Sequence, residues 1–345
     1  MTGLRFELSD ILQVELPLPF AFGSVNAYLV RLTDGFLLVD CGMDTDPCRE
    51  AWEAFLRRQR IRWRDIRTVV VTHMHPDHCG LAPKIIEWSG ASLWMHAEES
   101  QLLDEVTLSD KRQEWVQTTL EMAGSPPEMR GKVKASFAAL KRALQPLKPD
   151  VLLWGGEALT AASGVVEILS TRGHSRGHLM LYHRSSRCLI AGDQMLEYTT
   201  PNIPWEADHD ALREYLRSLD HIARYEIDRI LPGHGAAFQG QHAWIEAARR
   251  HHMGRCDRIL DLLGHGAASA HSLVARLWPR SLAPLDYRFA AFEVLAHLAY
   301  LEGNGQVQRE NGASPVLWRL ACENRVAAPK MRVSRILSPP EKDAS

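Results

Sequence analysis

The sequence lacks the features that mark a secreted or membrane protein. Its start has no basic segment followed by a long apolar run, so no secretory signal is evident. No apolar stretch is long enough to span a bilayer. Its six cysteines are scattered and form no Cys-x-x-Cys pair. Scattered cysteines without a signal are typical of free thiols in a reducing compartment. We therefore expect a cytoplasmic protein without membrane association.

The chain also lacks a surplus of charge. Its 40 basic and 42 acidic side chains give a formal net charge of −2. Composition therefore gives no electrostatic case for binding nucleic acid or an anionic membrane. The 345 residues are enough for a large core and about two domains.

One short run carries most of the chemical information. His73-Met74-His75-Pro76-Asp77-His78 directly follows Thr68–Thr72, an apolar, β-branched segment that predicts a buried strand. Imidazole nitrogen and carboxylate oxygen are ligands that suit zinc and its first-row neighbours. The alternative is a polar loop or a pair of core histidines. Four such side chains would then need many separate partners to be buried, so we favour a metal site.

Four further segments each place a ligand-type side chain beside glycine at the end of a predicted strand. They contain Asp40, His174, Asp193 and His234. Glycine allows the tight turns that such strand ends need. Taken singly, each segment is a weak signal, because an isolated Gly-His is more often an ordinary loop histidine. In this order along the chain they reinforce one another.

Together these motifs resemble the five-motif signature of the metallo-β-lactamase superfamily over about residues 10–240. The resemblance implies an α/β fold, a four-layer αβ/βα sandwich with metals where strand-end loops converge. It implies that His73, His75 and His174 bind a first metal, that Asp77, His78 and His234 bind a second, and that Asp193 bridges them. Asp40, and in our interpretation His178, would support ligands rather than bind metal.

The resemblance also implies a function. Two divalent metal ions, most simply zinc with iron or manganese as alternatives, would share a bridging hydroxide that attacks the substrate. Asp77 would have a catalytic role as well, by holding or relaying a proton. No serine or cysteine nucleophile would be needed. We expect a hydrolase acting on an ester, thioester or lactone of a small organic molecule.

Residue patterns divide the chain into three parts. We predict a catalytic domain over 1–250, a winged-helix-like accessory domain over 251–325 and a flexible tail over 326–345. Within the first part, 97–148 is mainly helical, broken at Gly124–Pro127, and is expected either to form an amphipathic helical pair or to cap the substrate site. Asn311-Gly312 predicts a hairpin turn in the second part.

The winged-helix-like end and two loop and helix motifs resemble a glyoxalase II-like bacterial branch of the family. A related endoribonuclease shares that end, so a metal-dependent ribonuclease or phosphodiesterase is one alternative function. A mononuclear iron oxygenase is another. Residues 251–325 are nearly neutral, with eight arginines and no lysine against seven acidic residues, which does not favour nucleic acid. We expect the accessory domain to wall the pocket or form a homodimer contact.

Overall fold

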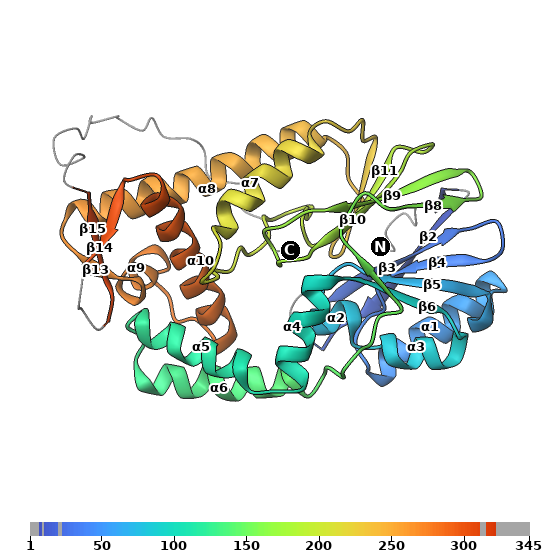
Figure 1. Cartoon of the computed structure of the whole chain (residues 1–345), viewed down its shortest axis with the longest axis horizontal. Coiled ribbons are helices and arrows are strands. Elements are labelled where there is room, and N and C mark those ends of the chain that lie inside the picture. Colours follow the sequence, from blue (N-terminus) through green and yellow to red (C-terminus); the bar gives the residue numbers. More distant parts are fainter. Residues whose placement is uncertain (1–6, 9, 20–22, 311–314, 322–345) are drawn as a thin grey trace, which may run out of the picture.

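Two mixed β-sheets form the centre of the larger part of the chain (Figure 1). The computed structural model describes residues 7–8, 10–19, 23–310 and 315–321. The first sheet has seven strands in the order β1 to β7. Its strands are β1 (Glu7–Leu8), β2 (Ile11–Pro17), β3 (Ser24–Arg31), β4 (Phe36–Val39), β5 (Ile66–Val71), β6 (Ser92–His96) and β7 (Val151–Leu153). Pairing is antiparallel from β1 to β4 and parallel from β4 to β7.

The second sheet has five strands in the order β12-β11-β10-β9-β8. Its strands are β8 (Ala158–Ala161), β9 (Gly164–Ser170), β10 (Leu179–His183), β11 (Cys188–Gly192) and β12 (Arg229–Pro232). The β11–β12 pair is parallel and the others are antiparallel. A bulge between Ile190 and Gly192 shifts the register at the end of β11, just before Asp193.

Strand alternation explains how the sheets stack. Successive side chains of a strand point to opposite faces. In β4, Leu37 and Val39 join a core cluster with Leu179 and Leu181 of β10, so this cluster fills the space between the sheets. Their neighbour Leu38 instead belongs to the cluster that contains helix residues. A strand buried on both faces reads as a continuous apolar run, which is how these segments appear in the sequence.

Helices cover the outer faces and complete a helix–sheet–sheet–helix order. They are α1 (Asp46–Gln59), the 3₁₀ helix η1 (Trp63–Asp65), α2 (Pro76–Cys79), α3 (Ala82–Ser89) and α7 (Ala211–Ile222). Trp52 of α1 is fully buried and its indole donates to the Cys41 carbonyl at 2.9 Å. The predicted α/β sandwich is therefore confirmed.

The predicted helical segment 97–148 contains three helices rather than a pair. They are α4 (Ala97–Thr107), α5 (Lys111–Met122) and α6 (Pro127–Lys141). The break at Gly124–Pro127 is where the sequence placed it. A second break falls at Leu108–Asp110, where Lys141 of α6 bonds to the Ser109 carbonyl and the Asp110 carboxylate at 2.8 and 2.9 Å. Sequence periodicity alone does not reveal this turn.

The C-terminal part contains helices and a small sheet. Its elements are α8 (Gln241–Gly264), α9 (Ala270–Leu277), α10 (Pro284–Gly303), β13 (Ala268–Ser269), β14 (Val307–Arg309) and β15 (Leu317–Leu320), with strand order β13-β15-β14. Helix α8 runs through the boundary predicted at residue 250, so no loop separates the two parts there. The predicted hairpin strands pair as β14 and β15. The Asn311-Gly312 turn and the 326–345 tail lie outside the described residues.

The C-terminal part packs against α5 and α6. The Tyr287 hydroxyl of α10 donates to the Ser125 hydroxyl at 2.7 Å, and the His271 ring nitrogen lies 2.8 Å from the same tyrosine oxygen. Backbone amides of His271 and Val316 donate to carbonyls at the end of α5. The break between α5 and α6 is therefore held by α9, α10 and β15, and these elements form one continuous body.

Two further expectations concern the whole chain. Within the described residues, no helix has the length and hydropathy needed to cross a bilayer. Five cysteines, at positions 41, 48, 79, 188 and 256, are free and buried, as the sequence predicts; Cys322 lies outside the described residues. The compartment itself stays a prediction.

Two buried tyrosines make a matched test of the packing between α10 and the α5–α6 break. Tyr287→Phe removes both hydrogen bonds and leaves Ser125 and His271 without this partner, so we expect about 1–3 kcal/mol of destabilisation. The Tyr215 hydroxyl is buried with no hydrogen-bond partner among the described residues, so Tyr215→Phe should be neutral or stabilising. Denaturant unfolding of both variants measures this, and equal losses would contradict the assignment.

Candidate metal centre

The predicted site residues meet at one edge of the sandwich. His73 to His78 follow β5, His174 lies between β9 and β10, Asp193 follows β11, and His234 follows β12. Their ligand-type atoms form overlapping groups in which all atoms lie within 4.8 Å of one another. The groups are His73, His75 and His174; His73, His78 and Asp193; and Asp77, His78 and His234. All seven residues predicted to bind metal are thus brought together.

Three ring nitrogens converge in the first group. His75 Nδ1 lies 2.9 Å from His73 Nε2 and 3.2 Å from His174 Nε2. The His73 and His174 rings meet edge to face, with centroids 4.9 Å apart. Their neighbour His78 packs against His73 with ring centroids only 4.1 Å apart.

Most of these imidazoles are held by a contact at Nδ1 that leaves Nε2 directed inward. His73 Nδ1 lies 3.0 Å from Thr72 Oγ1, and His174 Nδ1 lies 3.1 Å from the Asn202 carbonyl. His234 Nδ1 lies 2.8 Å from the Ser24 carbonyl. A carbonyl can only accept, so the last two rings donate from Nδ1, which fixes their tautomer. In the neutral form of each of these two rings, the lone pair is on Nε2, which faces the centre.

Asp40 anchors two parts of the His73–His78 run. Its Oδ1 accepts from the Thr72 amide at 2.8 Å, and its Oδ2 accepts from the Thr72 hydroxyl at 2.8 Å. His78 Nδ1 lies 2.7 Å from the same Oδ2. Asp40 itself adopts a left-handed conformation, with φ of 61°, which aspartate tolerates better than most residues. The structure therefore places Asp40 behind the ligands, as the resemblance implies.

His178 lies behind Asp193. Its Nε2 accepts from the Asp193 amide at 3.1 Å, while its Nδ1 lies 3.1 Å from the Thr171 hydroxyl. The next loop leaves space for this carboxylate only because residue 233 is glycine: a Cβ there would lie 2.3 Å from Asp193 Oδ1. His178 thus positions the Asp193 backbone and is absent from the groups that could hold a metal.

Burial and local charge divide the histidines into two kinds. Burial, followed by repulsion from neighbouring imidazoles, lowers the pKa of His73 well below its ordinary value and that of His75 to about 3. Burial also lowers the pKa of His174, against the attraction of Asp193. These three rings are therefore neutral at physiological pH and present lone pairs.

The carboxylates reverse this effect at the other two rings. Burial opposes protonation of His78 and His234, but Asp193 and nearby carboxylates outweigh it and raise the pKa of His78 well above its ordinary value and that of His234 to about 10. Burial likewise opposes ionisation of Asp77, yet His78 and His234 lower its pKa to about 2. Asp193 responds in the same way, with its pKa lowered.

These side chains fit divalent metal ions. His78 Nε2 and Asp193 Oδ1 are buried and form no hydrogen bond with the described residues; the two atoms lie 3.3 Å apart. Buried polar groups are normally satisfied. Imidazole nitrogens that lie close together beside two carboxylates are the donor set that zinc and related metals prefer.

Glu99 is a site residue that the sequence did not reveal. It is fully buried in the first turn of α4. Its Oε2 accepts from the Met74 amide at 2.8 Å, and its Oε1 accepts from the Ser175 hydroxyl at 2.6 Å and the Gly177 amide at 2.7 Å. One carboxylate thus ties the His73–His75 segment to the His174 loop. In the sequence it is one glutamate in a polar helix, so no pattern distinguishes it.

Asn26 performs a similar role for the His234 loop. It is buried in β3 and its side-chain amide donates to the carbonyls of Pro232 and Gly235 at 3.0 and 2.9 Å. The Tyr28 hydroxyl also donates to the Pro232 carbonyl, at 2.7 Å. These contacts join residues more than 200 positions apart, which is why the sequence gives no signal for them.

Two nearby nucleophile-type side chains are engaged elsewhere. Gly173 to Gly177 has a Gly-x-Ser-x-Gly spacing, but it lies in a loop between strands and the Ser175 hydroxyl donates to Glu99. Cys79 is buried and its thiol donates to the Met74 carbonyl at 3.2 Å. Neither provides the exposed, activated nucleophile of a covalent mechanism.

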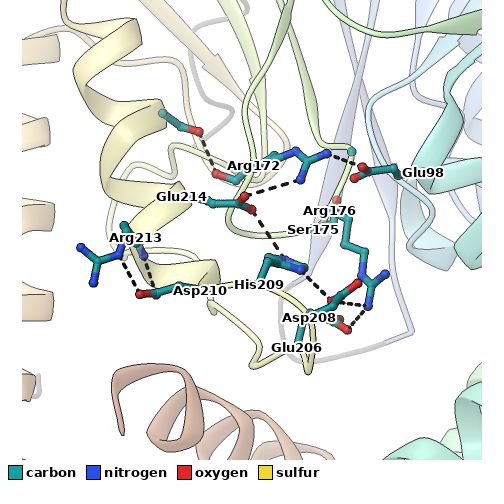
Figure 2. A network of polar contacts seen from close by, with 12 residues as sticks. Glu98, Arg172, Ser175, Arg176, Glu206, Asp208, His209, Asp210, Arg213 and Glu214 are labelled. Atoms are coloured by element: carbon teal, nitrogen blue, oxygen red, sulfur yellow. Dashed lines mark hydrogen bonds and ion pairs between the residues drawn. The ribbon is translucent and has the colours of Figure 1, made fainter. Parts of the chain in front are cut away.

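A chain of ion pairs flanks the His174 loop (Figure 2). Arg172 pairs with Glu98 of α4 and lies 3.5 Å from Glu214 of α7. Arg176 pairs with Glu206 at 2.7 Å and with Asp208 at 3.2 Å. The loop that carries His174 is therefore held on both sides by charged contacts to separate elements.

The αβ/βα sandwich, with imidazoles and carboxylates gathered at its strand ends, defines a metal-binding hydrolase. Residues 21–234 match the family model described as the Metallo-beta-lactamase superfamily, and residues 256–319 match one described as a Metallo-beta-lactamase-like C-terminal domain. The chain belongs to the metallo-beta-lactamase superfamily, whose members typically bind divalent metals.

Relatives extend over most of the chain. The Bacillus subtilis protein named "Probable metallo-hydrolase YqjP" is 25% identical over 85% of this chain and 92% of its own length. The human protein named "Acyl-coenzyme A thioesterase MBLAC2" is 22% identical over 62% of this chain and 74% of its own. The crystal structure of a metallo-beta-lactamase family protein from Thermus thermophilus is 29% identical, has a TM-score of 0.79, and covers 91% of this chain and 99% of its own.

Glu99→Gln tests the link between the two histidine loops. The glutamine side chain has one accepting oxygen where Glu99 has two. Its NH₂ group would face one of the donors that now bond to Glu99. We expect metal affinity to fall about 10–100-fold, as for other groups that orient ligands. Competition with a chelator measures this. Asp104→Asn, at an exposed position of the same helix, should leave the affinity unchanged.

Metal loading should release protons. In the metal-free protein the raised pKa values of His78 and His234 keep both rings protonated near pH 7, and a metal ion can bind only the neutral rings. Apparent affinity should therefore weaken as the pH falls from 8 to 6. Calorimetry of zinc binding in buffers with different ionisation enthalpies counts the protons. A binding enthalpy that is the same in every buffer would contradict this charge assignment.

Proposed function

We propose that this protein is a dinuclear metal-dependent hydrolase that acts on an ester, thioester or lactone of a small organic molecule. The three overlapping groups of ligand atoms are the observation that carries this proposal. His73, His75 and His174 would hold one metal, Asp77, His78 and His234 the other, and Asp193 would lie between them. Zinc is the metal that this nitrogen-rich set favours.

The metals, when bound, would supply Lewis acidity and a nucleophile generated from water near neutral pH. The protein's own residues would do the rest. Asp77 is partly exposed at the centre, and its Oδ2 lies 3.2 Å from His234 Nε2; it would accept a proton and relay it beside the reacting group. Asp40, Glu99 and Asn26 fix the loops, so that few groups need to move during the reaction.

Two observations support a small-molecule substrate. Residues 251–325 are nearly neutral in composition, and the human relative carries the name of an acyl-coenzyme A thioesterase. Asn202 connects the site to α10, because its carbonyl contacts His174 while its amide donates to the Phe289 carbonyl at 3.2 Å and the Glu293 carboxylate at 3.1 Å. The C-terminal part would therefore form a wall of the pocket.

Finer features of the family resemblance remain part of this proposal. Three helices and a three-stranded sheet are compatible with a winged-helix-like domain and with the glyoxalase II-like branch. A homodimer contact through that domain and a cytoplasmic location stay predictions. Size-exclusion chromatography with light scattering would decide the first of these.

Replacing one histidine of the centre tests the proposal. His75→Ala removes a ligand from the first group, so it should lower bound metal and reduce turnover by at least about 100-fold without unfolding the chain. The assay is metal content by elemental analysis together with hydrolysis of a panel of esters, thioesters and lactones. His265→Ala, at an exposed position, is the control. Full activity in metal-depleted protein would refute the metal mechanism.

A further inference from the structure

Arg288 of α10 is a partly buried cation that forms no ion pair with the described residues. Its guanidinium lies over the rings of Phe137, Phe289 and Phe292, at 5.7, 5.6 and 5.5 Å from their centroids. Its Nε is buried and has no hydrogen-bond partner, and no carboxylate of the described residues forms an ion pair with it. The side chain as a whole is half-buried, so part of the guanidinium remains accessible.

Neighbouring arginines have partners, which makes Arg288 an exception. Arg112 of α5 makes a two-pronged contact with Glu206, and Arg176 binds the same carboxylate. Arg255 of α8 lies 3.4 Å from Glu293. Glu206 is only 4% exposed and is already shared by two guanidinium groups. It forms no ion pair with Arg288.

The surroundings of Arg288 therefore carry uncompensated positive charge. Burial, and then repulsion from Arg112, lowers the pKa of Arg288 to about 10 despite the attraction of Glu206. A guanidinium is more weakly hydrated than an ammonium and stacks well on aromatic rings. Stacking satisfies its faces but leaves the N–H groups at its edge without acceptors. A buried charge is normally paired, so this edge is suited to an anion.

The position of Arg288 connects it with the metal centre. It is adjacent in α10 to Phe289, whose carbonyl accepts from Asn202, and the Asn202 carbonyl contacts His174. Arg176, which shares Glu206 with Arg112, lies on the His174 loop (Figure 2). On its other side Arg288 contacts Phe137 of α6. The guanidinium thus lies where α6, α10 and the loop following β11 meet.

We propose that Arg288 binds an anionic group of the substrate, a carboxylate or a phosphate, while the bond to be cleaved lies at the metal centre. This inference rests on the proposed function and narrows its substrate class to organic anions. The planar N–H fork of arginine matches either anion. The phenylalanine rings exclude water around the pair, which strengthens the interaction. Arg288 would determine specificity and would not take part in bond cleavage.

Matched substrates test the proposal with Arg288→Met on the metal-loaded enzyme. A succinyl thioester and its methyl ester differ only in the carboxylate. Acetyl-phosphopantetheine and acetyl-pantetheine differ only in the phosphate. For the anionic member of the pair that Arg288 recognises, we expect kcat/KM to fall at least about tenfold, mainly through KM, with the neutral member unaffected. A response of the succinyl pair would show that Arg288 recognises a carboxylate in the acyl group. A response of the pantetheine pair would show that it recognises a phosphate in the thiol part.

Other outcomes would overturn the inference. If Arg288→Met slows charged and neutral substrates equally, or slows none of them, the arginine has only a packing role on its three rings. Metal content and thermal stability should match those of the wild type. Arg276→Met, at an exposed position of α9, controls for loss of one positive charge. Arg288→Lys should recover only part of the preference, because it keeps the charge and loses the fork.

A binding measurement separates this inference from the proposed function. Calorimetric titration of the metal-loaded protein with succinate and with inorganic phosphate requires no turnover. An anion that binds only at the metals would bind the wild type and Arg288→Met equally. Equal binding would overturn the inference even if hydrolysis is found. Binding at least about tenfold weaker in the variant supports the anion site even if no member of the panel is hydrolysed.

Discussion

The arrangement of the centre depends on one buried carboxylate, that of Asp40. It accepts hydrogen bonds from the Thr72 amide and the Thr72 hydroxyl, and it contacts Nδ1 of His78. These three contacts fix the end of β4 to the end of β5 and set the direction in which the following histidines project. The Thr72 hydroxyl also orients the His73 ring, because its oxygen lies 3.0 Å from His73 Nδ1. A charged acceptor of several donors is among the stronger anchors available in a low-dielectric interior.

A second constraint is the cost of burying so many polar rings together. The imidazoles of one group are kept neutral by burial, whereas those beside Asp77 and Asp193 are kept charged by the carboxylates. Cations between these groups would satisfy the lone pairs of the first set and replace the protons of the second. Glu99 and Asn26 serve the same arrangement from a distance, because each ties down the backbone of a ligand loop. The geometry of the site therefore depends on contacts that hold several loops in fixed positions relative to one another.

The helices beyond the sandwich give the centre its surroundings. The break between α5 and α6 is held by α9, α10 and β15, and Asn202 joins α10 to His174. These elements carry aromatic rings, Arg112, which shares the buried Glu206 with Arg176 of the His174 loop, and Arg288, which forms no ion pair with the described residues. Under the proposed function the metals would supply the chemistry and the added helices would select the substrate.

The sequence by itself determined the sandwich and pointed to the residues that gather at the candidate metal centre. Apolar runs that end in ligand-type residues beside glycine are local signals. They predict strands followed by tight turns, because backbone sterics and the burial of apolar side chains favour that structure. The third helix in 97–148 and the passage of α8 through residue 250 were not predictable, because each depends on contacts with distant segments. Only the tertiary structure decided the roles of Glu99, Asn26 and Arg288. Each is an ordinary residue in its own element. Folding brings hydrogen-bond partners beside Glu99 and Asn26, whereas it places no carboxylate of the described residues in an ion pair with Arg288.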